Sequence, residues 1–240
     1  MTKPTVAIVL LVKNELEPMK EIIPKIDRSL IDDIFCMDGH STDGSIEFLE
    51  KQGIRVVEQR VMGRGNAVTE SITKSDADYL LYFSPDGNED PNDILIMIKK
   101  MRETGAVLVI ARRFGPYAQS DDSDDKFYIR KIGNLFYSLM VRILWRGKIW
   151  DAINGFRLVN RRVLHLLNQN VAGHQIEIQQ TIRCLKLGLH IEEIPTIEAV
   201  RVGGMRKSPT WKMGLQFIRL LFDELVLGRK FLYSSAGNSE

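Results

Sequence analysis

The chain has 240 residues, of which 44% are hydrophobic and 27% are charged, and its formal net charge is +2. This composition supports a full hydrophobic core, excludes a disordered chain, and excludes nucleic-acid binding driven by bulk charge. Cys36 and Cys184 are too few for a disulfide framework and lack metal-ligand spacing, so we expect core thiols in a reducing cytosol.

Apolar runs of strand length alternate with helical patterns over the first 111 residues. Strands are expected at residues 6–12, 34–37, 54–58, 79–83 and 107–111. Helices are expected at residues 17–28, 44–52, 64–75 and 91–103. This alternation, with short connections, predicts an α/β fold with a mostly parallel central sheet and helices on both faces.

The pattern changes after residue 113, where an acidic run at residues 121–125 precedes a long helical pattern. Helices are expected at residues 127–145, 161–168, 176–187 and 210–227, and a strand at residues 190–194. There is no internal repeat and no low-complexity linker, so residues 1–230 are expected to form one domain. Its last helix is amphipathic, and residues 231–240 are expected to be a flexible tail.

No apolar run approaches the roughly 20 residues that cross a bilayer. The N-terminal sequence also lacks a short apolar segment that ends in a cleavage site. We therefore expect neither a membrane-spanning segment nor secretion.

Polar residues directly follow the first two predicted strands. Asn14 and Glu15 come after the first, and Asp38 and His40 come after the second. Ligands of parallel α/β sheets bind where strands end, so these side chains are candidates for contacts with the base and ribose of a nucleotide-sugar. A structural alternative stays open, with Glu15 as a helix-start acid and Asp38 as a turn former.

A glycine-containing turn precedes the third predicted helix. Gly63 and Arg64 begin the segment Gly63-Arg64-Gly65-Asn66-Ala67, which can bring backbone amides and one guanidinium against an anion at a helix N-terminus. A single Gly-x-Gly is a weak signal, and a plain helix-entry turn is the alternative.

The turn Asp86-Gly87-Asn88 follows the fourth predicted strand and is the sharpest candidate for chemistry. A carboxylate and an amide oxygen two residues apart are hard ligands suited to Mg²⁺ or Mn²⁺, with positions left for a diphosphate and water. The alternative is an ordinary Asp-Gly turn before a helix that has Pro91 in its first turn.

These turns, in their order and spacing, resemble glycosyltransferase family 2 proteins of the GT-A fold. The segments that carry the resemblance are residues 12–15, 38–45, 63–67 and 84–91. Three later segments resemble the dolichyl-phosphate mannose or glucose synthase subgroup. They are residues 154–158, 176–178 and 188–195. The match covers most of residues 5–210.

The resemblance implies roles for the donor site. Glu15 and Asp38 would hold the nucleoside, and Asp86 and Asn88 would hold the metal, with Asp86 essential to catalysis. The family's metal turn commonly carries an acid two places before Asp86, where this chain has Ser84. One carboxylate is therefore missing.

The resemblance also implies roles for basic residues. Arg112 and Arg113 would contact phosphates near the transfer point, and Arg157 would lie on the acceptor side, although Gly-Phe-Arg could equally be packing. A phosphomonoester, with a second pKa of about 6, is already anionic and needs cations rather than a base. Arg201 and Lys207 lie in a glycine-containing basic loop that offers such cations, unless this loop is only a solvated one.

Two segments have wide apolar faces that suit a lipid acceptor. They are residues 135–145 and 213–227, and basic residues surround the second. An interfacial helix among lipid headgroups is one interpretation, and a core or dimer helix is the other.

The sequence thus indicates an inverting, metal-dependent glycosyltransferase that moves a sugar from a UDP- or GDP-sugar to a polyprenyl phosphate. It would act at the cytoplasmic face of the membrane as a peripheral protein, without nucleic acid, and a homo-oligomer is left open. One alternative is transfer to a glycan hydroxyl in surface-polysaccharide assembly, with Asp151 as candidate base. Another is a non-catalytic nucleotide-sugar binding protein, suggested by Ser84.

Overall fold

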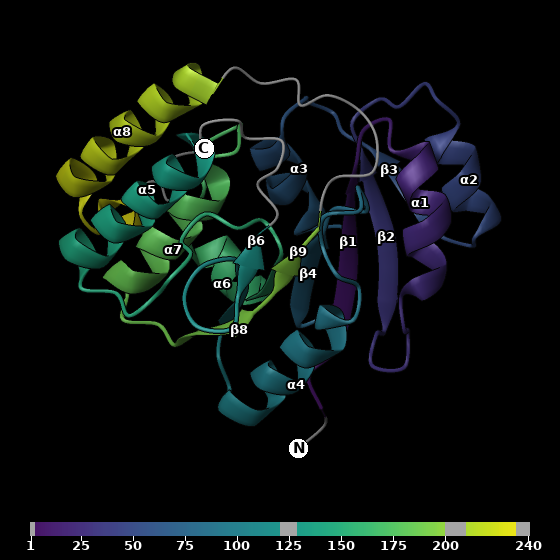
Figure 1. Ribbon diagram of the computed structural model, residues 1–240, viewed down its shortest axis with the longest axis horizontal. Coiled ribbons are helices and arrows are strands. Elements are labelled where there is room, and N and C mark those ends of the chain that lie inside the picture. The colour runs from purple at the N-terminus through teal and green to yellow at the C-terminus, as the bar shows by residue number, and fades with distance from the viewer. Residues whose placement is uncertain (1–2, 121–128, 200–209, 234–240) are drawn as a thin grey trace.

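The computed structural model describes residues 3–120, 129–199 and 210–233. Its main element is a seven-stranded sheet with the order β3-β2-β1-β4-β7-β5-β8 (Figure 1). The strands are β1 (Val6–Val12), β2 (Asp33–Asp38), β3 (Arg55–Glu58), β4 (Tyr79–Phe83), β5 (Leu108–Arg112), β7 (Arg157–Asn160) and β8 (Ile191–Pro195). Two short parallel strands, β6 (Gln119–Ser120) and β9 (Ile197–Glu198), pair with each other beside this sheet.

Strand β1 lies in the interior of the sheet and is buried on both faces. Val6, Ile8 and Leu10 point into one hydrophobic cluster, while Ala7 and Val9 point into another. Side chains alternate between the faces of a strand, so a continuous apolar run is what a strand covered on both sides requires.

Helices cover both faces of the sheet (Figure 1). One face packs against α1 (Leu16–Ile22), α2 (Ser45–Lys51) and α4 (Asp93–Thr104). The other packs against α3 (Arg64–Ser71), α6 (Arg161–Leu166) and α7 (Ile176–Lys186). The predicted α/β architecture with a mostly parallel sheet is confirmed.

Strand β7 is a departure from the predicted order of elements. It pairs antiparallel with both β4 and β5 and so separates two parallel parts of the sheet. Four residues are too few to show a clear two-residue period, so no strand is predicted here from the sequence. Its insertion brings residues 154–157 to the edge where β4 and β5 end.

A third hydrophobic cluster lies between α7, α5 (Ile129–Trp145) and α8 (Thr210–Leu227). The chain then forms a 3₁₀ turn, Lys230–Tyr233, in which Phe231 is buried against the guanidinium of Arg183. Phe231 is therefore docked, although the sequence analysis placed it in a flexible tail. A similar turn, Ile23–Lys25, follows α1 where a longer helix was expected.

Both cysteines are free and buried, as expected for core thiols. Burial raises the pKa of Cys184 to about 12. None of the helices in the described part of the chain combines the length and apolar character needed to cross a membrane.

Helix α8 is fastened to α7 by charges rather than by apolar packing alone. Glu224, 1% exposed, accepts hydrogen bonds from Arg183 Nε at 2.9 Å, Lys186 Nζ at 2.5 Å and Gln179 Nε2 at 3.0 Å. Burial disfavours its ionised form, but hydrogen bonds from Arg183 and Lys186 hold the pKa of Glu224 below its usual value.

Removing this carboxylate should destabilise the fold strongly. Glu224→Ala leaves Arg183 and Lys186 without their buried counter-ion, and we expect it to lower the free energy of unfolding by about 3–5 kcal/mol. Asp223→Ala, which removes the exposed partner of Arg219, is the matched control, with an expected cost of about 0.5 kcal/mol. Urea denaturation of both variants measures the difference, and equal costs would contradict the role of Glu224.

The contribution of Glu224 to the free energy of unfolding should also depend on pH. A carboxylate whose pKa is lower in the folded than in the unfolded state stabilises the fold above its unfolded pKa. The contribution of Glu224 should thus be complete at neutral pH and should disappear as the pH falls through its lowered folded-state pKa.

Candidate functional site

The polar turns predicted from the sequence lie at one edge of the sheet. Strands β2, β1 and β4 are parallel neighbours, with Val12 opposite Asp38 and Leu10 opposite Phe83. Their carboxyl ends therefore face the same way, which brings together the segments that follow Val12, Asp38 and Phe83. The turns converge because neighbouring parallel strands end at the same edge of the sheet.

The first two turns are joined by a hydrogen-bonded network. The carboxylate of Asp38, 1% exposed, accepts from the backbone N–H of Ser41 at 2.9 Å and from its hydroxyl at 2.5 Å. The Ser41 hydroxyl accepts from the backbone N–H of Asn14 at 2.9 Å, and Asn14 Oδ1 accepts from Thr42 N–H at 2.8 Å. Asp38 therefore holds the shape of the turn, and its contact with a nucleoside stays a prediction.

Asn14, Glu15 and His40 are at the rim of this network. Asn14 and His40 have left-handed backbones, with φ of 56° and 59°, a conformation that Asn and His adopt more readily than most residues. The backbone N–H of Glu15 donates to Ser45 Oγ at 3.1 Å, and its side chain is half-buried. His40 is exposed. All three therefore lie where a base or ribose could be recognised.

The two glycines around Arg64 allow a close approach between backbones. Gly65 N–H donates to Ala172 O at 2.8 Å, and a Cβ on Gly65 would lie 2.0 Å from Val171 O. A Cβ on Gly63, whose φ is +132°, would lie 2.4 Å from Ala172 O. These contacts favour the alternative of a helix-entry turn, in which both glycines allow the start of α3 to pack against residues 171–172.

Arg64 itself links the end of β4 to α7. Its Nε is ion-paired with Glu177, and its Nη1 donates to Ser84 Oγ at 3.1 Å. Gly155 makes room for this side chain, because a Cβ there would lie 1.9 Å from Arg64 Nη2. Burial opposes the charge of Arg64, but the carboxylates of Glu177, Glu89 and Asp86 raise its pKa. Arg64 is thus a fixed cation beside the candidate metal turn.

The turn after β4 contains an amide oxygen without a partner. Asn88 is 8% exposed, and its Oδ1 has no hydrogen-bond partner. Its backbone N–H donates to Asp86 Oδ1 at 3.2 Å, and its carbonyl accepts from Ala199 N–H at 3.0 Å. A buried polar atom normally has a partner, and an unpaired oxygen beside a carboxylate suits a hard cation such as Mg²⁺ or Mn²⁺.

Protein side chains would supply only part of the coordination of such a cation. Within the described residues, no three His, Cys, Asp or Glu side chains are placed to hold a metal by themselves. A cation at Asp86 and Asn88 would therefore take its other ligands from a diphosphate and water.

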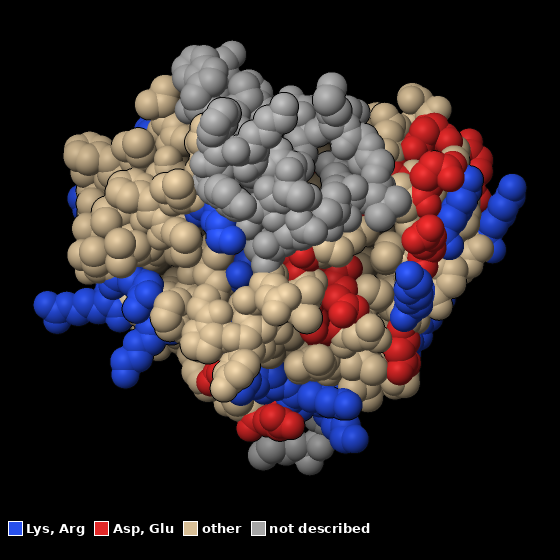
Figure 2. Space-filling view, in the orientation of Figure 1, with Lys and Arg blue, Asp and Glu red and all other residues tan. Residues whose placement is uncertain are grey.

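Two acidic residues beside this turn were not recognised in the sequence. Glu89 lies near both Asp86 and Glu198, and burial, together with repulsion from these two carboxylates, raises the pKa of Glu89 well above its usual value. Acidic side chains gather near the middle of the face in Figure 2. Glu89 lies inside the recognised motif, whereas Glu198 reaches the site through strand β9, which no periodicity revealed.

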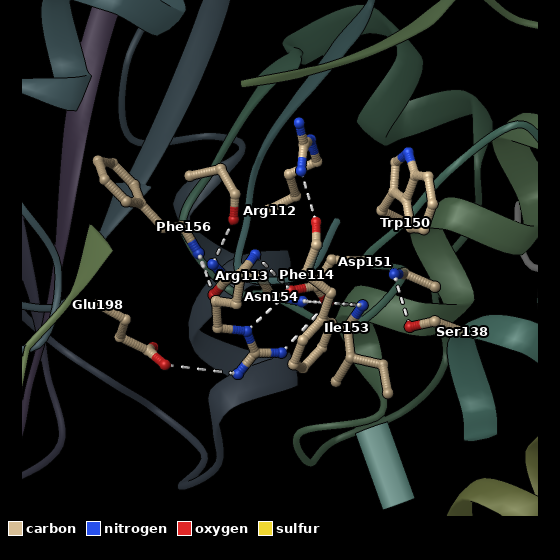
Figure 3. Close-up of polar contacts among 12 residues, drawn as sticks. Arg112, Arg113, Phe114, Ser138, Trp150, Asp151, Ile153, Asn154, Phe156 and Glu198 are labelled. Atoms are coloured by element: carbon tan, nitrogen blue, oxygen red, sulfur yellow. Dashed lines mark hydrogen bonds and ion pairs between the residues drawn. The ribbon is translucent and has the colours of Figure 1, made fainter. Parts of the chain in front are cut away.

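The two arginines at the end of β5 face different partners (Figure 3). Arg112 donates to the carbonyls of Phe114 at 2.6 Å and Pro116 at 2.7 Å, and so braces the following loop. Arg113 makes a two-pronged ion pair with Asp151, with Nε–Oδ2 at 2.8 Å and Nη2–Oδ1 at 3.1 Å. Its Nη1 lies 4.0 Å from Glu198 Oε2 (Figure 3).

Asp151 is fully engaged by this arrangement. It is completely buried and also accepts from the backbone N–H groups of Ile153 and Asn154 at 3.2 and 3.1 Å. Burial favours its neutral form, but Arg113 and these N–H groups hold the pKa of Asp151 below its usual range. Such a carboxylate is a poor proton acceptor, which argues against Asp151 as a general base.

Arg157 lies beneath the site rather than in it. It is 1% exposed, and its guanidinium donates to the carbonyls of Asn154 and Glu177, both at 2.8 Å, and to Gln180 Oε1 at 3.2 Å. Burial lowers the pKa of Arg157 to about 10, so it is still charged at neutral pH. These contacts favour the packing interpretation that the sequence left open.

Arg201 and Lys207, together with the acidic run at residues 121–125, lie outside the described residues. Near Arg113 the protein has an open pocket of about 540 Å³. Its lining combines two cations with apolar side chains and consists of Arg113, Phe114, Gly115, Ala118, Gln119, Lys131 and Leu135.

The chain is similar to known proteins in both family and fold. The model of the family described as glycosyl transferase family 2 matches residues 7–167, which is more than half of the chain. Glycosyltransferase AglJ of Haloferax volcanii is 25% identical over 227 residues, covering 93% of this chain and 73% of that protein. A dolichyl-phosphate hexose transferase of the same organism is 24% identical, covering 85% of this chain and 86% of the relative.

Solved structures share the fold. Glucosyl-3-phosphoglycerate synthase from Mycobacterium tuberculosis, in complex with Mn²⁺ and UDP-glucose, superposes with a TM-score of 0.68 at 21% identity. The alignment covers 94% of this chain and 79% of the synthase. The fold is therefore GT-A.

The start of α3 provides a test of the packing described above. We expect Gly65→Ala to lower the free energy of unfolding by about 1–3 kcal/mol, because its Cβ would collide with the carbonyl of Val171. Gly133→Ala in α5, where the nearest atom to the added Cβ is 3.9 Å away, should instead stabilise by up to about 1 kcal/mol. Thermal and urea unfolding compare the two, and a neutral Gly65→Ala would remove the steric argument.

Proposed function

Because the chain belongs to glycosyl transferase family 2 and is a glycosyltransferase, we propose that it moves a sugar from a UDP- or GDP-sugar to a polyprenyl phosphate. The observation that carries the proposal is the convergence of the Asn14, Asp38 and Asp86 turns at one edge of the sheet. Relatives support the acceptor class. One is named a dolichyl-phosphate hexose transferase, and another, from Methanococcus voltae, a UDP-N-acetylglucosamine–dolichyl-phosphate N-acetylglucosaminyltransferase.

In this proposal each part of the donor meets a different element. Glu15, Asp38 and His40 flank the nucleoside, and Arg64 faces the phosphates from the start of α3. Asp86 and Asn88 would hold a divalent cation, Mg²⁺ or Mn²⁺, which would supply positive charge to neutralise the diphosphate leaving group. The synthase of M. tuberculosis with the same fold binds Mn²⁺ and UDP-glucose, which is consistent with this choice of ligands.

The reaction would be a single displacement with inversion at the sugar. An oxygen of the acceptor phosphate forms a bond to the anomeric carbon as the bond from that carbon to the nucleoside diphosphate breaks. No proton has to be removed from the nucleophile, because a phosphomonoester is already anionic. This agrees with the state of Asp151, whose ion pair with Arg113 and lowered pKa make it a poor proton acceptor.

The open pocket beside Arg113 suits an acceptor with a charged head and an apolar chain. Arg113 and Lys131 would face the phosphate, while Phe114 and Leu135 would contact the first part of the lipid. The pocket is continuous with α5, which supplies Lys131 and Leu135. A lipid chain leaving it would therefore run along this helix.

Helices α5 and α8 lie side by side (Figure 1). Both carry large exposed apolar residues, which are Ile129, Ile132, Leu135, Phe136, Leu139, Ile143, Leu144, Leu215, Ile218, Phe222, Leu225 and Val226. Arg219, Arg229 and Lys230 are exposed on and just after α8. An apolar face with cations nearby fits the headgroup region of an anionic membrane, so we propose peripheral attachment at the cytoplasmic face.

Loss of the Asp86 carboxylate should abolish transfer without unfolding the protein. We expect Asp86→Asn to reduce turnover at least about 100-fold, the typical cost of removing one electrostatic group from an active site. Asp90→Asn, on the same turn, is the matched control and should retain activity. A thermal-shift panel of UDP, GDP and their sugar conjugates, with and without Mn²⁺, should show a metal-dependent stabilisation that Asp86→Asn lacks.

Either of two results would count against this function. Full activity of Asp86→Asn would remove Asp86 from the mechanism. A folded native protein that no nucleotide stabilises, with or without Mn²⁺, would contradict the donor site itself.

The membrane face can be tested by replacing exposed apolar residues. We expect the double variant Ile218→Ser, Phe222→Ser to bind vesicles of anionic lipid at least about tenfold more weakly, because each side chain loses about 1.5–3 kcal/mol of burial. Ile96→Ser, an equally exposed site on α4, should bind like the native protein. Unchanged sedimentation with vesicles, or conversion of a dimer to a monomer in light scattering, would assign this face to another role.

A further inference from the structure

The position that lacks the family's usual acid is covered by another carboxylate. Ser84 directly follows β4, and its backbone N–H donates to Glu89 Oε2 at 2.7 Å. Glu89 therefore folds back from the far end of the turn onto the residue where the missing acid would stand. The Ser84 hydroxyl accepts from Arg64 Nη1, which is also held by Glu177.

The location of Glu89 is unfavourable for an anion without a cation nearby. Glu89 is 9% exposed, so its carboxylate is largely removed from water. Asp86 and Glu198 are close and repel it, and Arg64, the nearby cation that attracts it, is already paired with Glu177. A second cation among these carboxylates would offset both the repulsion and the desolvation.

A separate observation points to a ligand at the same place. Asn88 lies between Asp86 and Glu89 on the turn, and its nearly buried Oδ1 has no partner. Its backbone is fixed on both sides, by Asp86 at its N–H and by Ala199 at its carbonyl. A buried, unpaired oxygen on a turn that also carries two carboxylates is a feature that cation binding would explain.

We propose that Glu89 is the second carboxylate of the divalent-cation site and acts with Asp86 in place of the acid absent at Ser84. This inference rests on the proposed function, because it concerns the metal that the donor diphosphate would share. In this arrangement the second carboxylate comes from a residue five positions after Ser84, and the fold of the turn brings it back to the end of β4. The site thus has two carboxylates although position 84 lacks the acid.

The test separates the charge of Glu89 from its hydrogen bond. Glu89→Gln keeps an oxygen for the Ser84 N–H and changes only the charge, so the turn should stay intact. We expect it to weaken Mn²⁺ binding about 10- to 100-fold, measured by EPR titration in the presence of UDP and, separately, GDP. Nucleotide binding without metal and the melting temperature should not change. Glu103→Gln, at the opposite end of α4, is the control for loss of one acidic charge.

A rescue experiment makes the assignment specific. If Glu89 replaces the acid missing at position 84, then adding Ser84→Asp to Glu89→Gln should restore Mn²⁺ affinity to within a fewfold of the native value. A purely structural role for Glu89 predicts no such rescue.

The outcomes distinguish this inference from the proposed function. If Asp86→Asn removes Mn²⁺ binding and Glu89→Gln does not, Glu89 is no ligand and only the present inference fails. If Glu198→Gln weakens binding while Glu89→Gln has no effect, the second carboxylate is Glu198 and the assignment to Glu89 is overturned. If the native protein binds no Mn²⁺ with either nucleotide, the metal-dependent function itself fails.

Discussion

The ion pair between Arg64 and Glu177 holds the two halves of the chain together at the edge of the sheet. Arg64 begins α3 in the first half, Glu177 lies at the start of α7 in the second, and both are largely buried. Removing either partner would leave an uncompensated charge in the interior, so the pair connects the start of α3 to the start of α7. Because Arg64 also contacts Ser84, the end of β4 is held in register with both helices.

The positive charges around this edge fall into two groups. The guanidinium groups of Arg157 and Arg183 donate hydrogen bonds to carbonyls and a carboxylate of the protein itself, and so stabilise the packing around α7. Arg64 and Arg113 are also ion-paired, yet their side chains keep 18% and 13% of their surface exposed at the site. A cation oriented in advance by a protein carboxylate needs little reorganisation when an anionic ligand arrives. The carboxylate of Glu193, whose pKa burial raises to about 7, accepts a hydrogen bond from the backbone N–H of Asp151 at 2.9 Å.

The sequence predicted the first half of the molecule because its signals are local. In β1 and β4 nearly every residue is apolar, and each strand is followed by a polar turn, so both the sheet and the meeting of the turns could be inferred. The second half depends on contacts over long distances in the chain. Strand β7 is too short to show a period, and Glu198, which acts on Glu89, lies in the short strand β9 that pairs with β6. The burial of Arg157 could not be predicted either, because the identity of the residue does not indicate whether its side chain contacts a ligand or the protein interior.

The two sides of helix α8 have different roles: the inward side attaches the helix to the protein, and the outward side is exposed. Its attachment depends on Glu224 and a few buried apolar residues such as Phe217 and Leu221, while Phe222 and Val226 on the other side contribute little to the folded core. Substitutions on the outward side are thus nearly neutral for folding, whereas those on the inward side are not. Because substitutions on the outward side cost little folding free energy, the affinity of this side for a surface can change without compensating substitutions in the interior.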